Sequence, residues 1–124
     1  MPNIDWTVTA LGEEHDLHPI RDSLRAEGVD VVRANSLEHA VSTDPRVILC
    51  DADASDCWRD SLAKLRKPGR RIILVSRTAN NRMWIEALNH GAFDLLPKSD
   101  DVRETCGTIL RALFAGRPAP LEAA

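Results

Sequence analysis

The chain has 124 residues, of which 44% are hydrophobic and 28% charged. This composition is typical of one folded domain and excludes an intrinsically disordered chain. Its formal net charge of −3 provides no overall attraction to nucleic acid or to an anionic membrane surface. No apolar run approaches the roughly 20 residues that span a bilayer, and the first residues do not form a signal peptide. We therefore expect a cytoplasmic protein with no nucleic acid and no membrane among its partners.

Short apolar segments alternate with helix-like segments in the first part of the chain. Residues 6–11 predict a first strand, followed by a helix that Asp16 caps and Gly28 ends in a left-handed conformation. The apolar face of this helix consists of Leu17, Ile20 and Leu24. Residues 29–34 predict a second strand, and residues 36–41 a short helix capped by its first residue.

Two further strands flank a helix in the middle of the chain. Residues 46–51 predict the third strand, which is followed by a polar loop over residues 52–56. Asp56 is placed to cap a helix from about residue 57 to 66. Residues 70–76 then predict the fourth strand. The basic run over residues 64–71 is expected to form a solvated turn, and phosphate contact is the alternative.

The last part of the chain predicts two helices around a fifth strand. A helix over residues 82–90 stops at Gly91, and we expect Met83 and Trp84 to lie in the core. Residues 93–97 predict the fifth strand, and the last helix extends to about residue 115. The apolar positions of the helix over 82–90 exceed what one buried face requires, which indicates a protein interface there.

Three of these strands end on chemically active side chains. They are short and apolar throughout, as is typical of central strands in a parallel sheet with both faces covered. Asp51 and Ser76 end two of them, and Lys98 follows the third. Because ligands bind beyond the carboxyl ends of parallel strands, we expect these three side chains to meet at one edge. The alternation of strands and helices requires right-handed crossovers and places helices on both faces.

The cysteines do not predict a disulfide framework or a zinc site. Cys50, Cys57 and Cys106 are odd in number and show no C-x-x-C spacing. Cys50 and Cys106 fall at apolar positions, so we expect both in the core.

A family resemblance rests mainly on the segment around the fifth strand, which reads Gly91-Ala92-Phe93-Asp94-Leu95-Leu96-Pro97-Lys98. Together with an acid ending the third strand and a serine ending the fourth, it resembles the receiver domains of response regulators in two-component signalling. The resemblance covers nearly the whole chain. It implies a flavodoxin-like, doubly wound α/β fold with a five-stranded parallel sheet in the order 2-1-3-4-5 and five helices. The receiver-like domain would span residues 1–116, followed by a C-terminal tail over 117–124.

The resemblance also assigns roles to the strand ends. Asp51 would accept a phosphoryl group, the Ser76 hydroxyl would contact that group, and Lys98 would pair with its oxygens. A carboxylate can attack phosphorus in this way, but the developing charge needs a cation and fixed donors. Receivers hold Mg²⁺ there, so the implied ligands are Glu13, Glu14, Asp51 and the backbone carbonyl of Asp53.

The sequence departs from the receiver pattern at several of these positions. Counted back from Gly28 without a gap, the usual acidic pair falls on Leu11 and Gly12, so Glu13 and Glu14 reach those places only after a shift in register. Leu95 stands at the usual aromatic switch position, and Lys98 is followed by Ser99 where receivers usually have proline. The sequence pattern of the receiver fold is thus retained better than the residues of the receiver's metal site and conformational switch.

Two signalling functions follow, and neither is enzymatic. The first is an atypical receiver that is phosphorylated on Asp51 by a histidine kinase or phosphotransfer protein. It would signal to a downstream protein through the helix over 82–90, the fifth strand and the last helix, and a homodimer is also considered. The alternative is a degenerate receiver that is never phosphorylated and binds its partner constitutively. A small enzyme or nucleotide-binding protein is a third reading, but the loop after the first strand lacks a glycine-rich phosphate cradle.

Overall fold

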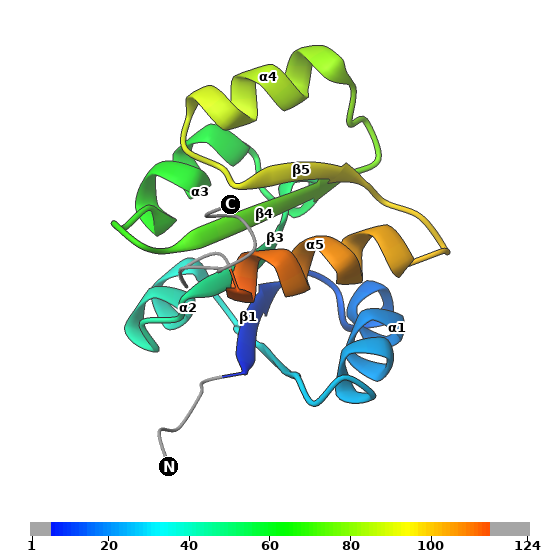
Figure 1. Ribbon diagram of the computed structural model, residues 1–124. Coiled ribbons are helices and arrows are strands. Elements are labelled where there is room, and N and C mark those ends of the chain that lie inside the picture. Colours follow the sequence, from blue (N-terminus) through cyan, green and yellow to red (C-terminus); the bar gives the residue numbers. More distant parts are fainter. Residues whose placement is uncertain (1–5, 115–124) are drawn as a thin grey trace, which may run out of the picture.

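The computed structural model describes residues 6–114 as alternating strands and helices (Figure 1). The strands are β1 (Thr7–Leu11), β2 (Asp30–Arg33), β3 (Val47–Asp51), β4 (Arg71–Ser76) and β5 (Asp94–Pro97). The helices are α1 (Glu14–Arg25), α2 (Leu37–Ser42), α3 (Trp58–Leu65), α4 (Asn81–Asn89) and α5 (Arg103–Phe114), with a short 3-10 helix η1 (Ala52–Ala54). The predicted tail over residues 117–124 lies outside the described residues.

The strands form one parallel sheet in the order β2-β1-β3-β4-β5. This confirms the predicted flavodoxin-like α/β fold. The register pairs Asp51 with Val75 and Ser76 with Pro97, so β3, β4 and β5 end at the same edge of the sheet. The strand ends that carry chemistry are therefore neighbours.

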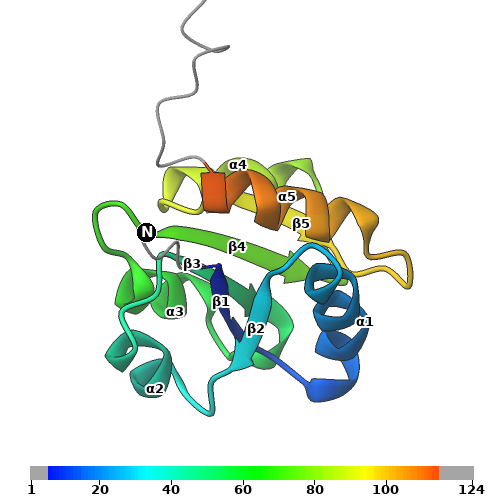
Figure 2. The ribbon, with the colours of Figure 1, turned by 60° about the horizontal axis from the view of Figure 1, so that its bottom comes forward.

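Helices cover both faces of the sheet, and β3 shows why its apolar run is continuous. Val47 and Leu49 belong to the core beneath α1 and α5, whereas Ile48 and Cys50 belong to the core beneath α2, α3 and α4. Successive side chains of a strand point to opposite faces, so both must be apolar when both faces are covered. Figure 2 shows α1 and α5 on one side of the sheet and α2 with α3 on the other.

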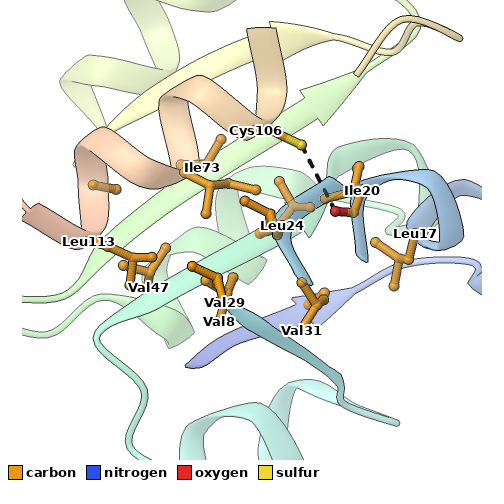
Figure 3. Close-up of a cluster of buried hydrophobic side chains, with 14 of the residues drawn as sticks. Val8, Leu17, Ile20, Leu24, Val29, Val31, Val47, Ile73, Cys106 and Leu113 are labelled. Carbon is orange, nitrogen blue, oxygen red and sulfur yellow. Dashed lines mark hydrogen bonds between the residues drawn. The ribbon is translucent and has the colours of Figure 1, made fainter. Parts of the chain in front are cut away.

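The core on the α1 and α5 side is closed by long aliphatic side chains (Figure 3). Leu24, Ile109 and Leu113 are 0–1% exposed there. Cys50 and Cys106 are both buried, as predicted. Burying a leucine or isoleucine side chain stabilises the fold by about 1.5–3 kcal/mol. Within the described residues no helix is long and apolar enough to cross a bilayer.

The predicted end of α1 is confirmed, but its start is not. Gly28 has φ +79°, and its amide and that of Val29 donate to the carbonyls of Arg25 and Leu24 at 3.0 and 2.9 Å. This is a left-handed helix end that glycine adopts without strain. The helix begins at Glu14 with Glu13 at the N-cap, because the Glu13 carbonyl already accepts from the Asp16 amide at 3.0 Å. Asp16 therefore lies in the first turn and is not the cap.

The segment after β3 is more ordered than the predicted polar loop. Residues 52–54 form η1, and Asp51 caps this turn by accepting from the Asp53 amide at 2.9 Å. Helix α3 begins at Trp58 with Cys57 as the N-cap, so the predicted cap at Asp56 is wrong. The Ser55 hydroxyl accepts from the Cys57 amide at 3.2 Å. Ser55 thus fixes the approach to α3 one residue earlier than we expected.

Two further expectations about side-chain burial are corrected. The Arg70 side chain in the basic run is only 3% exposed, because its guanidinium donates to the carbonyls of Pro45 and Leu65 at 2.9 and 2.7 Å. Arg70 therefore ties a turn together and is not solvated. Trp84 is 43% exposed and not part of the core, and its indole N–H donates to Asp94 at 2.9 Å. Ile85, its neighbour on α4, is 54% exposed.

Candidate functional site

The three predicted strand-end residues meet at the carboxyl edge of the sheet, although not all of them touch. The Lys98 ammonium nitrogen lies 2.7 Å from Oδ2 of Asp51. The side chains of Asp51 and Lys98 are 6% and 15% exposed, so this ion pair is largely shielded from water. Ser76 ends the neighbouring strand and is fully buried. Its hydroxyl, however, donates to a carboxylate other than Asp51.

The partner of Ser76 is Asp53, whose side chain the sequence did not single out. The Ser76 hydroxyl donates to Oδ1 of Asp53 at 2.7 Å. The backbone amide of Arg77 donates to Oδ2 at 2.7 Å, and the Lys98 ammonium lies 3.4 Å from the same oxygen. Only the backbone carbonyl of Asp53 was predicted to take part in a site. A signal was nevertheless available, since an acid two residues after Asp51 reaches the same edge when the chain turns tightly.

Thr78 completes the contacts of the buried Ser76 hydroxyl. The Thr78 amide donates to the Ser76 oxygen at 3.1 Å, and the two hydroxyl oxygens lie 3.0 Å apart. The segment between β4 and α4 is thereby held against the end of β4. Because Asp53 bonds both Ser76 and Arg77, it links this segment to the turn after β3.

The charges at this edge support one another. Burial alone would raise the pKa of Asp53, but the Arg77 amide, the Ser76 hydroxyl and Lys98 together hold it below its usual value. Burial alone would lower the pKa of Lys98, but its contacts with Asp51 and Asp53 raise it above the usual value. Both groups are therefore charged at neutral pH.

The acids after β1 are dispersed. Glu14 is exposed and forms an ion pair with Arg21, which holds the pKa of its carboxyl below the usual value. Glu13 is exposed at the N-cap of α1. Gly12 is the residue that lies against Asp51, and a Cβ atom built on it would be 3.2 Å from the Cβ of Asp51. Asp16, which we expected to cap the helix, instead has its carboxylate 3.7 Å from the Lys98 ammonium.

Two hollows flank Asp51 at this edge. The larger has a volume of about 730 Å³, and its lining includes Asp16, Asp51, Arg77 and Lys98. The smaller has a volume of about 340 Å³, and its lining includes Glu13, Arg33 and Asp51. Of the two glutamates predicted as metal ligands, Glu13 thus shares a hollow with Asp51, whereas Glu14 is occupied by Arg21.

The donor set does not fit the magnesium ion that the resemblance implies. Among residues 6–114 no three His, Cys, Asp or Glu side chains are grouped so that they could hold one metal ion. Both oxygens of Asp51 already have partners, since Oδ1 accepts from the Asp53 amide and Oδ2 from Lys98. The predicted ligands Glu13, Glu14, Asp51 and the Asp53 carbonyl are therefore not assembled in this arrangement. The cation that lies among the carboxylates of Asp16, Asp51 and Asp53 is the Lys98 ammonium.

Comparison with solved structures places the fold among receiver domains. The beryllofluoride-activated NtrC4 receiver domain dimer gives a TM-score of 0.77 at 21% identity, covering 90% of this chain and 99% of that chain. A response regulator from Thermotoga maritima gives 0.75 at 14% identity, covering 86% and 96%. A putative CpaE2 pilus assembly protein from Sinorhizobium meliloti 1021 gives 0.67 at 15% identity, covering 86% and 98%.

The expected resemblance to receiver domains is thus confirmed for the fold. No protein-family model matches the sequence, and a search of curated proteins finds no significant match. Because a protein named for pilus assembly has the same fold as response regulators, the fold alone does not assign the function.

Proposed function

We propose that the chain is a signalling module of the receiver type that binds a partner protein without being phosphorylated. The observation that supports this most strongly is the charge around Lys98. The carboxylates of Asp16, Asp51 and Asp53 lie 3.7, 2.7 and 3.4 Å from its ammonium nitrogen. A phosphoryl group on Asp51 would add negative charge to three carboxylates that share one nearby ammonium. Without a divalent cation such an addition is electrostatically unfavourable.

The partner surface remains the one that the sequence indicated, formed by α4, β5 and α5. Trp84 and Ile85 on α4 are 43% and 54% exposed, which leaves apolar area on this surface. Aromatic side chains of this kind are enriched at protein interfaces. A downstream protein or a second copy of the chain would bind there. The similar NtrC4 receiver domain is described as a dimer, so sedimentation analysis of this chain is a direct test of the homodimer.

Phosphorylation of Asp51 is the second candidate function, and a specific contact favours it. Asp51 and Lys98 form the close pair that a phosphoacceptor and its charge partner would form, at 2.7 Å. Ser76 ends the adjacent strand, within the same network. A histidine kinase or phosphotransfer protein would supply the phosphoryl group, and Mg²⁺ would have to be recruited by a rearrangement of Glu13 or Asp16.

One experiment separates the two candidates. The protein and its Asp51→Asn variant are incubated with acetyl phosphate, with and without Mg²⁺, and their intact masses are measured. We expect no added phosphoryl mass in any sample. A metal-dependent gain of one phosphoryl group that Asp51→Asn abolishes would overturn the phosphorylation-independent module and establish the second candidate. Far-ultraviolet circular dichroism of each sample controls for folding.

A further inference from the structure

Three donor groups converge on the carboxylate of Asp53, two from consecutive residues at the end of β4 and one from the segment after β5. They are the Ser76 hydroxyl at the end of β4, the Arg77 backbone amide and the Lys98 ammonium after β5, at 2.7, 2.7 and 3.4 Å. A hydroxyl, an amide and an ammonium that face one point make a binding site for an oxyanion. The oxyanion at this position is the Asp53 carboxylate, which belongs to the same chain.

Two of these donors, the Ser76 hydroxyl and the Lys98 ammonium, need an acceptor here because they are shielded from water, whereas Arg77 is an exposed residue. Ser76 is fully buried, and the Lys98 side chain is 15% exposed. A buried donor that loses its partner destabilises a protein by about 1–3 kcal/mol, so the site favours an anion over an empty state. The Asp53 side chain is 26% exposed, so water reaches it more readily than it reaches Ser76 or Lys98.

The backbone delivers Asp53 to this position. Oδ1 of Asp51 accepts from the Asp53 amide at 2.9 Å and closes the η1 turn. The turn brings the side chain two residues beyond Asp51 over the ends of β4 and β5. As a result, the carboxylates of Asp51 and Asp53 bind the same Lys98 nitrogen from neighbouring positions, at 2.7 and 3.4 Å.

We propose that Ser76, Arg77 and Lys98 form an oxyanion site whose resident ligand is the carboxylate of Asp53. This carboxylate takes the donors that a phosphoryl group on Asp51 would require. The inference rests on the proposed function, because it explains how a module that is not phosphorylated keeps the segment before α4 in place. It also makes a claim of its own, namely that the site accepts an external oxyanion such as inorganic phosphate once the carboxylate is removed.

The role of Asp53 as an internal ligand has a consequence for α4. Arg77 and Thr78 lead from β4 toward this helix, and Asp53 holds them through the Arg77 amide and, by way of Ser76, through Thr78. Loss of the carboxylate is expected to increase amide hydrogen exchange in this segment. Helix α4 carries the exposed Trp84 and Ile85, so the proposed partner surface is connected to the oxyanion site.

The test uses the backbone amide of Arg77 as a reporter. Proton–nitrogen spectra of the full chain are recorded for the wild type, Asp53→Ala, Asp53→Asn and the control Asp56→Ala, which removes an exposed acid from the same loop. Each is titrated with sodium phosphate against sodium chloride at equal ionic strength. In Asp53→Ala we expect the Arg77 proton to move upfield and then to return downfield, saturably, at millimolar phosphate. The wild type and Asp56→Ala are expected to show no such response.

Two further comparisons sharpen the result. Adding Lys98→Ala to Asp53→Ala should weaken phosphate binding severalfold, because the ammonium is the charged donor of the site. Asp53→Asn keeps an acceptor oxygen but loses the charge, so its Arg77 amide should shift less than that of Asp53→Ala. Folding of each variant is visible in the dispersion of the same spectra.

The outcomes that would overturn the inference are equally specific. If the Arg77 amide shift of folded Asp53→Ala does not change with phosphate, the donors do not form an oxyanion site. An equal phosphate response in the wild type would show that Asp53 does not occupy it. Inorganic phosphate does not transfer a phosphoryl group to Asp51. The titration can therefore succeed even if the mass measurement with acetyl phosphate overturns the proposed function.

Discussion

A Cβ atom on Gly12 would lie 3.2 Å from the Cβ of Asp51 and 3.7 Å from its Oδ2 atom. The chain after β1 therefore passes directly beside the carboxylate that Lys98 binds. The receiver pattern implies an acid near this point, but here any side chain would be in tight contact with Asp51. Glu13 and Asp16, at the start of α1, instead line the hollows beside Asp51.

The contact between Gly12 and Asp51 predicts opposite effects for two glycine substitutions. Gly12→Ala should lower the free energy of unfolding by about 1 kcal/mol, because Asp51 is buried and must shift to admit a methyl group. Gly107→Ala should raise it by about 0.5–1 kcal/mol, because Gly107 lies within α5 and its Cβ would meet open space. Urea denaturation of the two variants measures both. If Gly12→Ala raises the free energy of unfolding as much as Gly107→Ala does, position 12 is not crowded.

The ion pair of Lys98 and Asp51 predicts strong coupling between the two residues. Lys98→Met should lower the free energy of unfolding by about 2–3 kcal/mol at neutral pH, since it leaves a buried carboxylate without its cation. Combining it with Asp51→Asn should recover part of this loss, because the unpaired charge is then removed. A double-mutant cycle by chemical denaturation measures the coupling. Additive effects of the two substitutions would mean that the pair does not contribute to stability.

The lowered pKa of Asp53 predicts a pH-dependent contribution to stability. Because its pKa is lower in the folded than in the unfolded chain, ionised Asp53 stabilises the fold above about pH 4. The contribution is lost as the pH falls through the folded pKa. Wild type should therefore be more stable than Asp53→Asn by about 1 kcal/mol at pH 7, and the difference should vanish in strong acid. Denaturation at a series of pH values measures this, with Asp56→Asn as the control that should show no such dependence.

The cysteines predict a simple labelling pattern. Burial raises the pKa of the Cys50 thiol to about 12, and burial also raises that of Cys106. A thiol must ionise to react, so neither should be alkylated in the folded protein at pH 8. Cys57 is partly exposed and should be the first to react. Mass spectrometry after iodoacetamide treatment should find one label on the native chain and three after denaturation. Labelling of Cys50 without unfolding would contradict its place in the core.

Much of the candidate site could be predicted from the sequence because it depends on strand ends. A parallel register places Asp51, Ser76 and Lys98 at one edge whatever the loops do. What each side chain contacts could not be predicted in the same way. Asp53 and Arg77 are 24 positions apart and meet only because η1 turns the first over the second. Helix-cap rules, which favoured Asp16 and Asp56, are local, and for Asp16 they do not include the Lys98 ammonium across the sheet edge.

The order of the elements, the parallel sheet and the edge at which its polar residues gather all follow from local patterns in the sequence. Apolar periodicity and glycine positions carry that information, because burial of alternate or helical faces acts over a few residues at a time. Three features could not be read from those patterns and come from the three-dimensional packing: the Ser76 hydroxyl bonds Asp53, Arg70 is enclosed while Trp84 is exposed, and Gly12 lies against Asp51. These outcomes depend on the path of each loop through space, which is fixed by packing between segments distant in the chain.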